Sequence, residues 1–288
     1  MKNSLFKIAL VLSIILISFA KLDVSASENE NIKYLTVNEY SELLKEYNYL
    51  SSLKKVARNT DDIINSKIED LKTKIDDYPK HIYKLKDKTD AELYLLNYSD
   101  EQIGIIRSYD GSFEQTLAVS ATVYAQLTLN SFSYSSTANR TYASATFSGY
   151  WNGTPFYRGT DNIGVSINGS LSRFAQNGYS AKITHADGTV IYNPSSEYIS
   201  MVGVRYKFGI TDGTGTIFKS FTMTYNAIAD GKNTIIDYGA AYAHNITTVT
   251  SFSLGLSYGS SVGVGISFSF GNLSSNMWKN VYTRTTYK

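Results

Sequence analysis

From Thr116 onward, short segments of alternating apolar and polar residues recur between turn signals. Asn-Gly or Asp-Gly pairs stand at positions 152–153, 168–169, 177–178, 187–188, 212–213 and 230–231. These pairs favour the positive φ angles of tight hairpin turns, and alternation places every second side chain of a strand on one face. The sequence therefore predicts about ten mostly antiparallel strands, packed as a β-sandwich over residues 112–288.

Residues 27–111 have helical periodicity instead. Thr36 and Glu39 have the spacing of a capping box, in which each side chain binds the backbone amide of the other residue. A second helix is expected over residues 61–78 and should end at Pro79, because proline removes a helical hydrogen bond. Together with the strands, this helical region predicts an α+β fold.

Two shorter helices are predicted before the strands begin. Asp90 is expected to cap residues 91–97, and Ser99, with Gln102 three residues later, has the pattern of another capping box. The stretch Asn97 to Gly111, NYSDEQIGIIRSYDG, resembles a segment of uncharacterised secreted proteins of Gram-positive bacteria. The resemblance implies a helical hairpin followed by a β-rich region, and it implies no particular activity.

The N-terminus has the features of a secretory signal. Lys2 and Lys7 form a basic start, an apolar run follows from Ile8 to Ala20, and small residues precede Ser27. We expect residues 1–26 to be removed after Ala26, with Ala20 as the other candidate site, and the protein to be secreted and extracellular or associated with a cell surface. No other segment has the apolar length of a transmembrane helix.

Composition limits the chemistry that is available. The chain of 288 residues has no cysteine, which excludes thiol catalysis and cysteine-based metal sites. Its 27 Lys and Arg residues nearly balance 25 Asp and Glu residues, and no dense basic tract indicates nucleic acid as a partner.

Catalytic patterns are weak in this sequence. His81, His185 and His244 have no metal-ligand spacing, and there is neither a nucleophile elbow nor a phosphate-binding loop. We therefore expect no metal, no cofactor and no enzymatic activity. A pair of carboxylates brought together in space, as in a secreted hydrolase, remains the third interpretation.

An aromatic cluster surrounds the Asn152-Gly153 turn signal. It comprises Tyr150, Trp151, Phe156, Tyr157 and Arg158. Aromatic rings at a loop tip can stack on a ligand such as a glycan or lie at a lipid interface. The alternative, which we favour, is that Trp151 and Phe156 point into the sandwich core and that Tyr150 or Tyr157 covers it.

The last candidate is an uncharged hairpin. No Asp, Glu, Lys or Arg occurs in the 41 residues from Tyr238 to Trp278. Within it, apolar residues alternate with Ser, Gly and Thr, and a three-residue loop at 259–261 would pair the apolar residues with one another: Tyr258 with Val262, Leu256 with Val264, Leu254 with Ile266 and Phe252 with Phe268. This register also sets Gly255 opposite Gly265.

Three interpretations of the hairpin remain open. Its apolar face could enter the sandwich core while a helix covers the Ser/Gly face, which is the interpretation that we favour. It could instead meet lipid, or the small face could dock a partner or a second copy. A membrane strand needs about 9–11 residues, and the first strand alternates over only seven, Phe252 to Tyr258.

The sequence thus favours a secreted, non-catalytic binding or interaction protein at a cell envelope or host surface. Its ligand would be a glycan, an envelope component or a membrane surface. The alternative is a pore-forming or membrane-damaging protein that uses residues 250–271.

Overall fold

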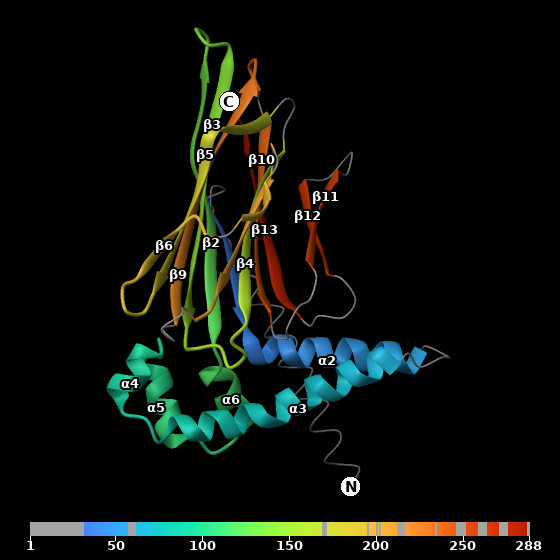
Figure 1. Ribbon diagram of the computed structural model, residues 1–288, viewed down its shortest axis with the longest axis vertical. Helices are drawn as coiled ribbons and strands as arrows, with labels where there is room; N and C mark the ends of the chain where they lie inside the picture. The colour runs from blue at the N-terminus through green and yellow to red at the C-terminus, as the bar shows by residue number, and fades with distance from the viewer. Residues whose placement is uncertain are drawn as a thin grey trace.

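The computed structural model describes residues 32–56, 62–168, 172–194, 196–199, 201, 203–211, 217–233, 235–245, 252–258, 264–270 and 276–286. The predicted signal segment at 1–26 lies outside these residues. Figure 1 shows helices gathered at one end of two stacked sheets, which confirms the predicted α+β fold with a sandwich of antiparallel strands.

The helical end contains five described helices. They are α2 (Glu39–Val56), α3 (Asp62–Leu85), α4 (Asp90–Leu95), α5 (Asp100–Ser108) and α6 (Phe113–Val119). The capping box predicted at Ser99 and Gln102 is confirmed at the start of α5. Their buried faces belong to the same core as the sandwich, so the helices and the sheets share one hydrophobic interior.

Several predicted helix boundaries were wrong. Thr36 lies in a strand, and the side chain of Asn38 accepts the Ser41 amide at 3.0 Å instead. Thr89, not Asp90, caps α4, in a box with Glu92. Helix α3 continues through Pro79, because burial of Tyr78 and Ile82 on either side favours the helix over the break that proline usually causes.

The described strands number thirteen rather than about ten. A six-stranded sheet has the order β1-β2-β3-β9-β5-β6, a five-stranded sheet has the order β13-β10-β4-β8-β7, and β11 pairs only with β12. Their bounds are β1 Ile32–Asn38, β2 Thr122–Ser135, β3 Arg140–Asn152, β4 Thr160–Asn168, β5 Ser172–His185, β6 Val190–Tyr192, β7 Ser196–Ile199, β8 Gly203–Gly209, β9 Phe218–Asp230, β10 Ile235–Asn245, β11 Phe252–Tyr258, β12 Val264–Phe270 and β13 Asn276–Thr286. Strand β1 comes from the region predicted to be helical.

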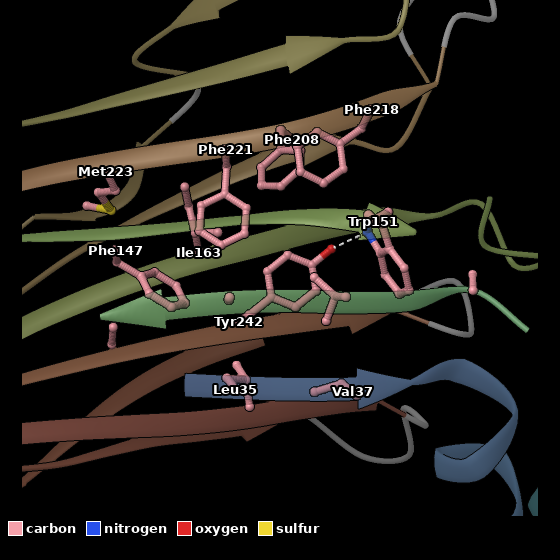
Figure 2. Close-up of a cluster of buried hydrophobic side chains, with 14 of the residues drawn as sticks. Leu35, Val37, Phe147, Trp151, Ile163, Phe208, Phe218, Phe221, Met223 and Tyr242 are labelled. Carbon is pink, nitrogen blue, oxygen red and sulfur yellow. Dashed lines mark hydrogen bonds between the residues drawn. The ribbon is translucent and has the colours of Figure 1, made fainter. Parts of the chain in front are cut away.

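The sandwich core lies between the inner faces of the two large sheets. Figure 2 shows Phe147 and Trp151 of β3, Phe221 of β9 and Tyr242 of β10 meeting there. All four are fully buried, and the Phe147 and Phe221 ring centroids are 5.0 Å apart. Alternation along each strand places these side chains inward and leaves their neighbours to form the outer faces.

Candidate functional site

The aromatic cluster at 150–158 does not form a hairpin tip. Strand β3 belongs to the six-stranded sheet and β4 to the five-stranded sheet, so residues 153–159 carry the chain from one sheet to the other. Gly153 keeps the positive φ of a turn, at 77°, but its amide donates to the Asn97 carbonyl at 2.7 Å. The crossing therefore ties the sandwich to the helical end.

Alternation along β3 separates the first two residues of this cluster. Trp151 is 2% exposed and lies in the core, as the alternative interpretation has it, whereas Tyr150 is 52% exposed on the outer face of the six-stranded sheet. Tyr150 stacks on Tyr124 of β2, with ring centroids 5.5 Å apart and an angle of 27° between the ring planes. Of the two residues, Tyr150 alone is placed to meet a ligand.

A groove surrounds this tyrosine pair on the outer face. It has a volume of about 440 Å³ and crosses β1, β2, β3 and β9. Its outward side chains, which we call the groove residues, are Tyr34, Tyr124, Gln126, Ser148, Tyr150, Ser220 and Thr222.

The strand register arranges the groove residues in two rows. One row runs across the strands from Tyr34 through Gln126 and Ser148 to Thr222. The other runs from Tyr124 through Tyr150 to Ser220. The groove therefore lies perpendicular to the strands, with amide and hydroxyl groups beside exposed aromatic rings.

The groove residues offer hydrogen-bonding groups without charge. None of them is Asp, Glu, Lys, Arg or His, and Gln, Ser, Thr and Tyr side chains both donate and accept. Partial burial, then the neighbouring Tyr150 and Glu101, raises the pKa of the Tyr124 hydroxyl, so it stays protonated at neutral pH. An uncharged ligand rich in hydroxyl groups matches this lining, whereas an ionic ligand finds no counter-charge in it.

A second polar cluster lies in the interior, where the helices meet the sandwich. The Glu39 carboxylate, at the start of α2, accepts hydrogen bonds from the Tyr78 hydroxyl at 2.7 Å and from the Phe156 and Tyr157 amides at 2.8 and 3.0 Å. His244 Nε2 lies 3.4 Å from the same carboxylate. Glu39 thus joins both long helices, the crossing and β10.

His244 extends this cluster into the five-stranded sheet. Its Nδ1 donates to Asp161 of β4 at 2.7 Å, and the Tyr242 hydroxyl donates to the other oxygen of Asp161. Trp151 Nε1 donates to the Tyr242 hydroxyl at 2.8 Å, the bond that Figure 2 draws as a dashed line. We call Glu39, Asp161 and His244, with Tyr78, Tyr242 and Trp151, the junction network.

The junction network is closed to solvent. Glu39, Asp161 and His244 are each 0% exposed. Burial lowers the pKa of His244, but the charges and hydrogen bonds of Asp161 and Glu39 outweigh it and raise the pKa to about 10. His244 is therefore a buried imidazolium between two carboxylates, an arrangement that holds elements together and offers no access for a substrate.

The other residues of the aromatic cluster belong to the same junction. The interpretation that Phe156 points into the core between the sheets is wrong, because Phe156 packs against Tyr78 and His81 of α3. The Tyr157 hydroxyl donates to the Lys74 carbonyl at 3.1 Å. Arg158 is exposed on the crossing. The structure thus divides the predicted ligand-binding residues between the groove, which takes Tyr150, and the helical junction, which takes Phe156 and Tyr157.

The predicted hairpin exists, with a different register. Strands β11 and β12 pair Phe252 with Phe270, Leu254 with Phe268, Leu256 with Ile266 and Tyr258 with Val264. The register is shifted by two residues from the predicted one, so apolar residues still oppose apolar residues, but the predicted pairing of Gly255 with Gly265 is wrong. Each of these glycines lies opposite a serine instead, which avoids a pair without side chains. Val262 lies outside the described residues.

The hairpin is not a strand pair of either large sheet, and the elements beside it differ from the expected helix. Strand β12 lies next to β10 and β4. Figure 1 places β11 and β12 on the side of the five-stranded sheet that is turned away from β2 and β9. The hairpin thus forms a third layer over the sandwich.

Sequence reasoning missed most of the groove. Alternation in β2 already places Tyr124 and Gln126 on the face opposite Val123, Ala125 and Leu127. That signal identifies an outer face, but only the register of β2 on β3 brings Tyr124 next to Tyr150.

Within the described ranges, no three His, Asp or Glu side chains come together as metal ligands do. Nor does any described helix combine the length and the apolar character that crossing a membrane requires.

Comparison with known proteins gives remote likenesses. No family model matches the sequence, and no curated protein matches it. Among solved structures, the chain is similar to a "pore forming protein" (8% identity, 58% of this chain and 86% of the other, TM-score 0.32). It is also similar to the collagen-binding subdomain of the Enterococcus faecalis surface protein ACE (7%, 52% and 88%, 0.29) and to the membrane-inserted form of the Clostridium perfringens NetB toxin (10%, 58% and 91%, 0.29). The matches thus include bacterial toxins and surface adhesins, at a distance that assigns no function.

Proposed function

We propose that the protein is a non-catalytic extracellular binding protein that holds a neutral glycan in the groove across β1, β2, β3 and β9. The observation that carries this proposal is the stacked, exposed pair Tyr124 and Tyr150, flanked by uncharged amide and hydroxyl groups. Sugar rings present both apolar C–H faces and hydroxyl groups, so they match aromatic rings bordered by donors and acceptors.

The size and composition of the groove support binding. Ligand sites commonly enclose about 300–1,000 Å³, and the volume of 440 Å³ falls in this range. One row crosses four strands and the other three, which favours an extended ligand, such as a polysaccharide of a cell envelope or host surface, lying across the sheet. Export is supported by the signal-like N-terminus.

The same lining argues against hydrolysis. Glycoside hydrolases use two carboxyl groups on either side of the bond that they cleave, and no groove residue carries a carboxyl group. The buried acids of the junction network have no exposed surface. The groove therefore supports binding without turnover.

Calorimetric titration with a panel of neutral hexasaccharides (cello-, malto-, manno- and galacto-) tests the proposal. Binding to at least one of them should fall by about tenfold or more in Tyr124→Ala and in Tyr150→Ala, because a stacked aromatic anchor contributes more than about 1.4 kcal/mol. Tyr192→Ala is the matched control, since Tyr192 is also exposed on the six-stranded sheet, in β6, and lies outside the groove. Its affinity should be unchanged.

Two results would contradict the proposal. One is the absence of heat across the whole neutral panel. The other is that an acidic chain, such as polygalacturonate, binds more tightly than the neutral oligosaccharides and loses as much affinity in Tyr192→Ala as in the two groove variants.

A further inference from the structure

The outer face of the five-stranded sheet is built from small residues where β4 and β10 cross it. On β10, the inner face holds Tyr238, Ala240 and Tyr242, so alternation places their neighbours on the outer face. The register pairs these outer residues with those of β4: Ala243 with Asn162, Ala241 with Gly164 and Gly239 with Ser166. We call these six buried residues the seat.

Strand β12 lies against the seat, because it neighbours both β10 and β4 on this side (Figure 1). Its ladder of pairs runs to β11 alone, over seven pairs of residues. Among the described strands, therefore, β11 and β12 can move away from the sandwich without breaking a ladder of either large sheet.

The seat is a poor match for the hairpin. It has no large apolar side chain, and it buries two polar atoms, Ser166 Oγ and Asn162 Oδ1, that have no hydrogen-bond partner among the described residues. Buried polar groups without partners favour exposure to water. Uncovering the seat would hydrate them.

One face of the hairpin is apolar, and the seat has no large apolar side chains to match it. The register groups eight apolar residues on one face and Ser or Gly on the other. If the apolar face turns to the seat, it meets small or polar residues, beside Arg205, which is paired with Gly164. If it turns outward, eight apolar residues meet water. In both cases a hydrocarbon environment suits this face better than the sandwich does.

We propose that β11 and β12 form a separable ribbon that leaves the seat and binds a phospholipid surface through its apolar face. The absence of charge from Tyr238 to Trp278 favours lipid over a protein partner, because charged side chains cannot contribute to the polar rim that protein interfaces usually have. Seven residues at about 3.3 Å each span about 23 Å, less than the roughly 30 Å hydrocarbon core. The described strands thus suit insertion into one leaflet.

The lack of cysteine makes the release directly measurable, since one introduced thiol reports one position. Ala241→Cys places a thiol in the seat, and Ala240→Cys places one on the inner face of the same strand; both alanines are 0% exposed. Vesicles of equimolar phosphatidylcholine and phosphatidylglycerol should speed maleimide labelling of Ala241→Cys by about tenfold or more, because labelling follows exposure. Ala240→Cys should remain protected.

Three outcomes would overturn the proposal. Protection of Ala241→Cys with vesicles would mean that the ribbon stays in place. Equal labelling rates of Ala241→Cys and Ala240→Cys with vesicles would indicate general unfolding on the vesicle surface. A labelling rate of Ala241→Cys that is the same with and without vesicles would show that lipid does not cause the exposure. Ala243→Cys, also in the seat, replaces Ala241→Cys if that variant does not fold.

Flotation with the same vesicles tests the apolar face independently. Leu256→Asp should lose most of the vesicle-bound fraction, whereas Ser257→Asp, at the adjacent position on the other face of β11, should keep it. Equal flotation of the two variants would contradict the proposal. So would a wild-type protein that does not float but sediments as a dimer that Leu256→Asp dissociates, because the partner would then be a second copy.

Discussion

Tyr78 and Tyr242 point into the junction between helices and sandwich, whereas Tyr124 and Tyr150 lie on the open face of the six-stranded sheet. In the junction, the hydroxyls bind the buried carboxylates of Glu39 and Asp161, and burial raises the pKa of both phenols well above the usual value. In the groove, the rings stack on each other and remain partly exposed. Tyrosine hydroxyls that bind internal partners thus hold elements together, while exposed tyrosine rings are available to a ligand.

The strongest test of this contrast removes the charge at the centre of the junction network. Glu39→Gln should lower the free energy of unfolding by about 3–5 kcal/mol, because it leaves the His244 imidazolium with one buried counter-charge fewer. Urea unfolding followed by circular dichroism measures the loss. Glu101→Gln, at an exposed site on α5, should change stability by less than about 0.5 kcal/mol.

The pH dependence of stability tests the charge on His244. The unfolded imidazole titrates near 6.5 and the folded one near 10, so its stabilising proton is fully present below pH 6.5 and is lost as the pH rises to 10. Unfolding free energy should fall over this range, by at most about 1.4 kcal/mol per pH unit. His81→Gln should retain this slope, because burial lowers the pKa of His81 to about 4. A flat profile from pH 7 to 10 would contradict the charged network.

Removing one hydroxyl oxygen, by changing Tyr to Phe, should have different effects in the junction and in the groove. Tyr242→Phe should cost about 1–3 kcal/mol, because the indole of Trp151 and the carboxylate of Asp161 each lose a buried hydrogen bond. Tyr124→Phe, on the open face, should leave the urea midpoint almost unchanged. Equal losses of stability in Tyr242→Phe and Tyr124→Phe would contradict the distinction between junction and groove tyrosines.

The smallest expected effect on stability comes from truncating a groove ring. Tyr34 is 50% exposed at the end of one groove row, so Tyr34→Ala should change the unfolding free energy by less than about 0.5 kcal/mol. It should still weaken binding of the neutral oligosaccharide that the wild-type protein selects. A large loss of stability without an effect on binding would give Tyr34 the structural role of Tyr78 and Tyr242 instead.

Local patterns were sufficient to predict the fold class. Alternation predicted the strands of the sandwich, and the Ser99 and Gln102 box predicted the start of α5. The dipeptide Asn152-Gly153 predicted a turn but not its use, because a positive φ does not specify whether the next strand joins the same sheet or the other one. Here the chain crosses to the other sheet, so the aromatic residues around the turn lie in different parts of the molecule.

The sites depend on contacts between distant residues, which local patterns do not report. Tyr124 and Tyr150 meet only through the pairing of β2 with β3. Asp161 and His244 are 83 positions apart, and each alone has the sequence context of an ordinary strand residue. Their partnership arises from the pairing of β4 with β10, which no turn signal joins directly.

The span of the junction network also constrains how the protein is made. Glu39 and His244 are 205 positions apart, so a ribosome has produced most of the chain before their contact is possible. Until β10 emerges, helix α2 begins with a carboxylate that lacks its buried cation, and docking of the helices onto the strands is incomplete. Because N-terminal segments appear first during synthesis, the junction network cannot form until most of the chain has been translated. If the protein is exported, as we propose, the junction network closes only after the chain has passed through the translocation channel.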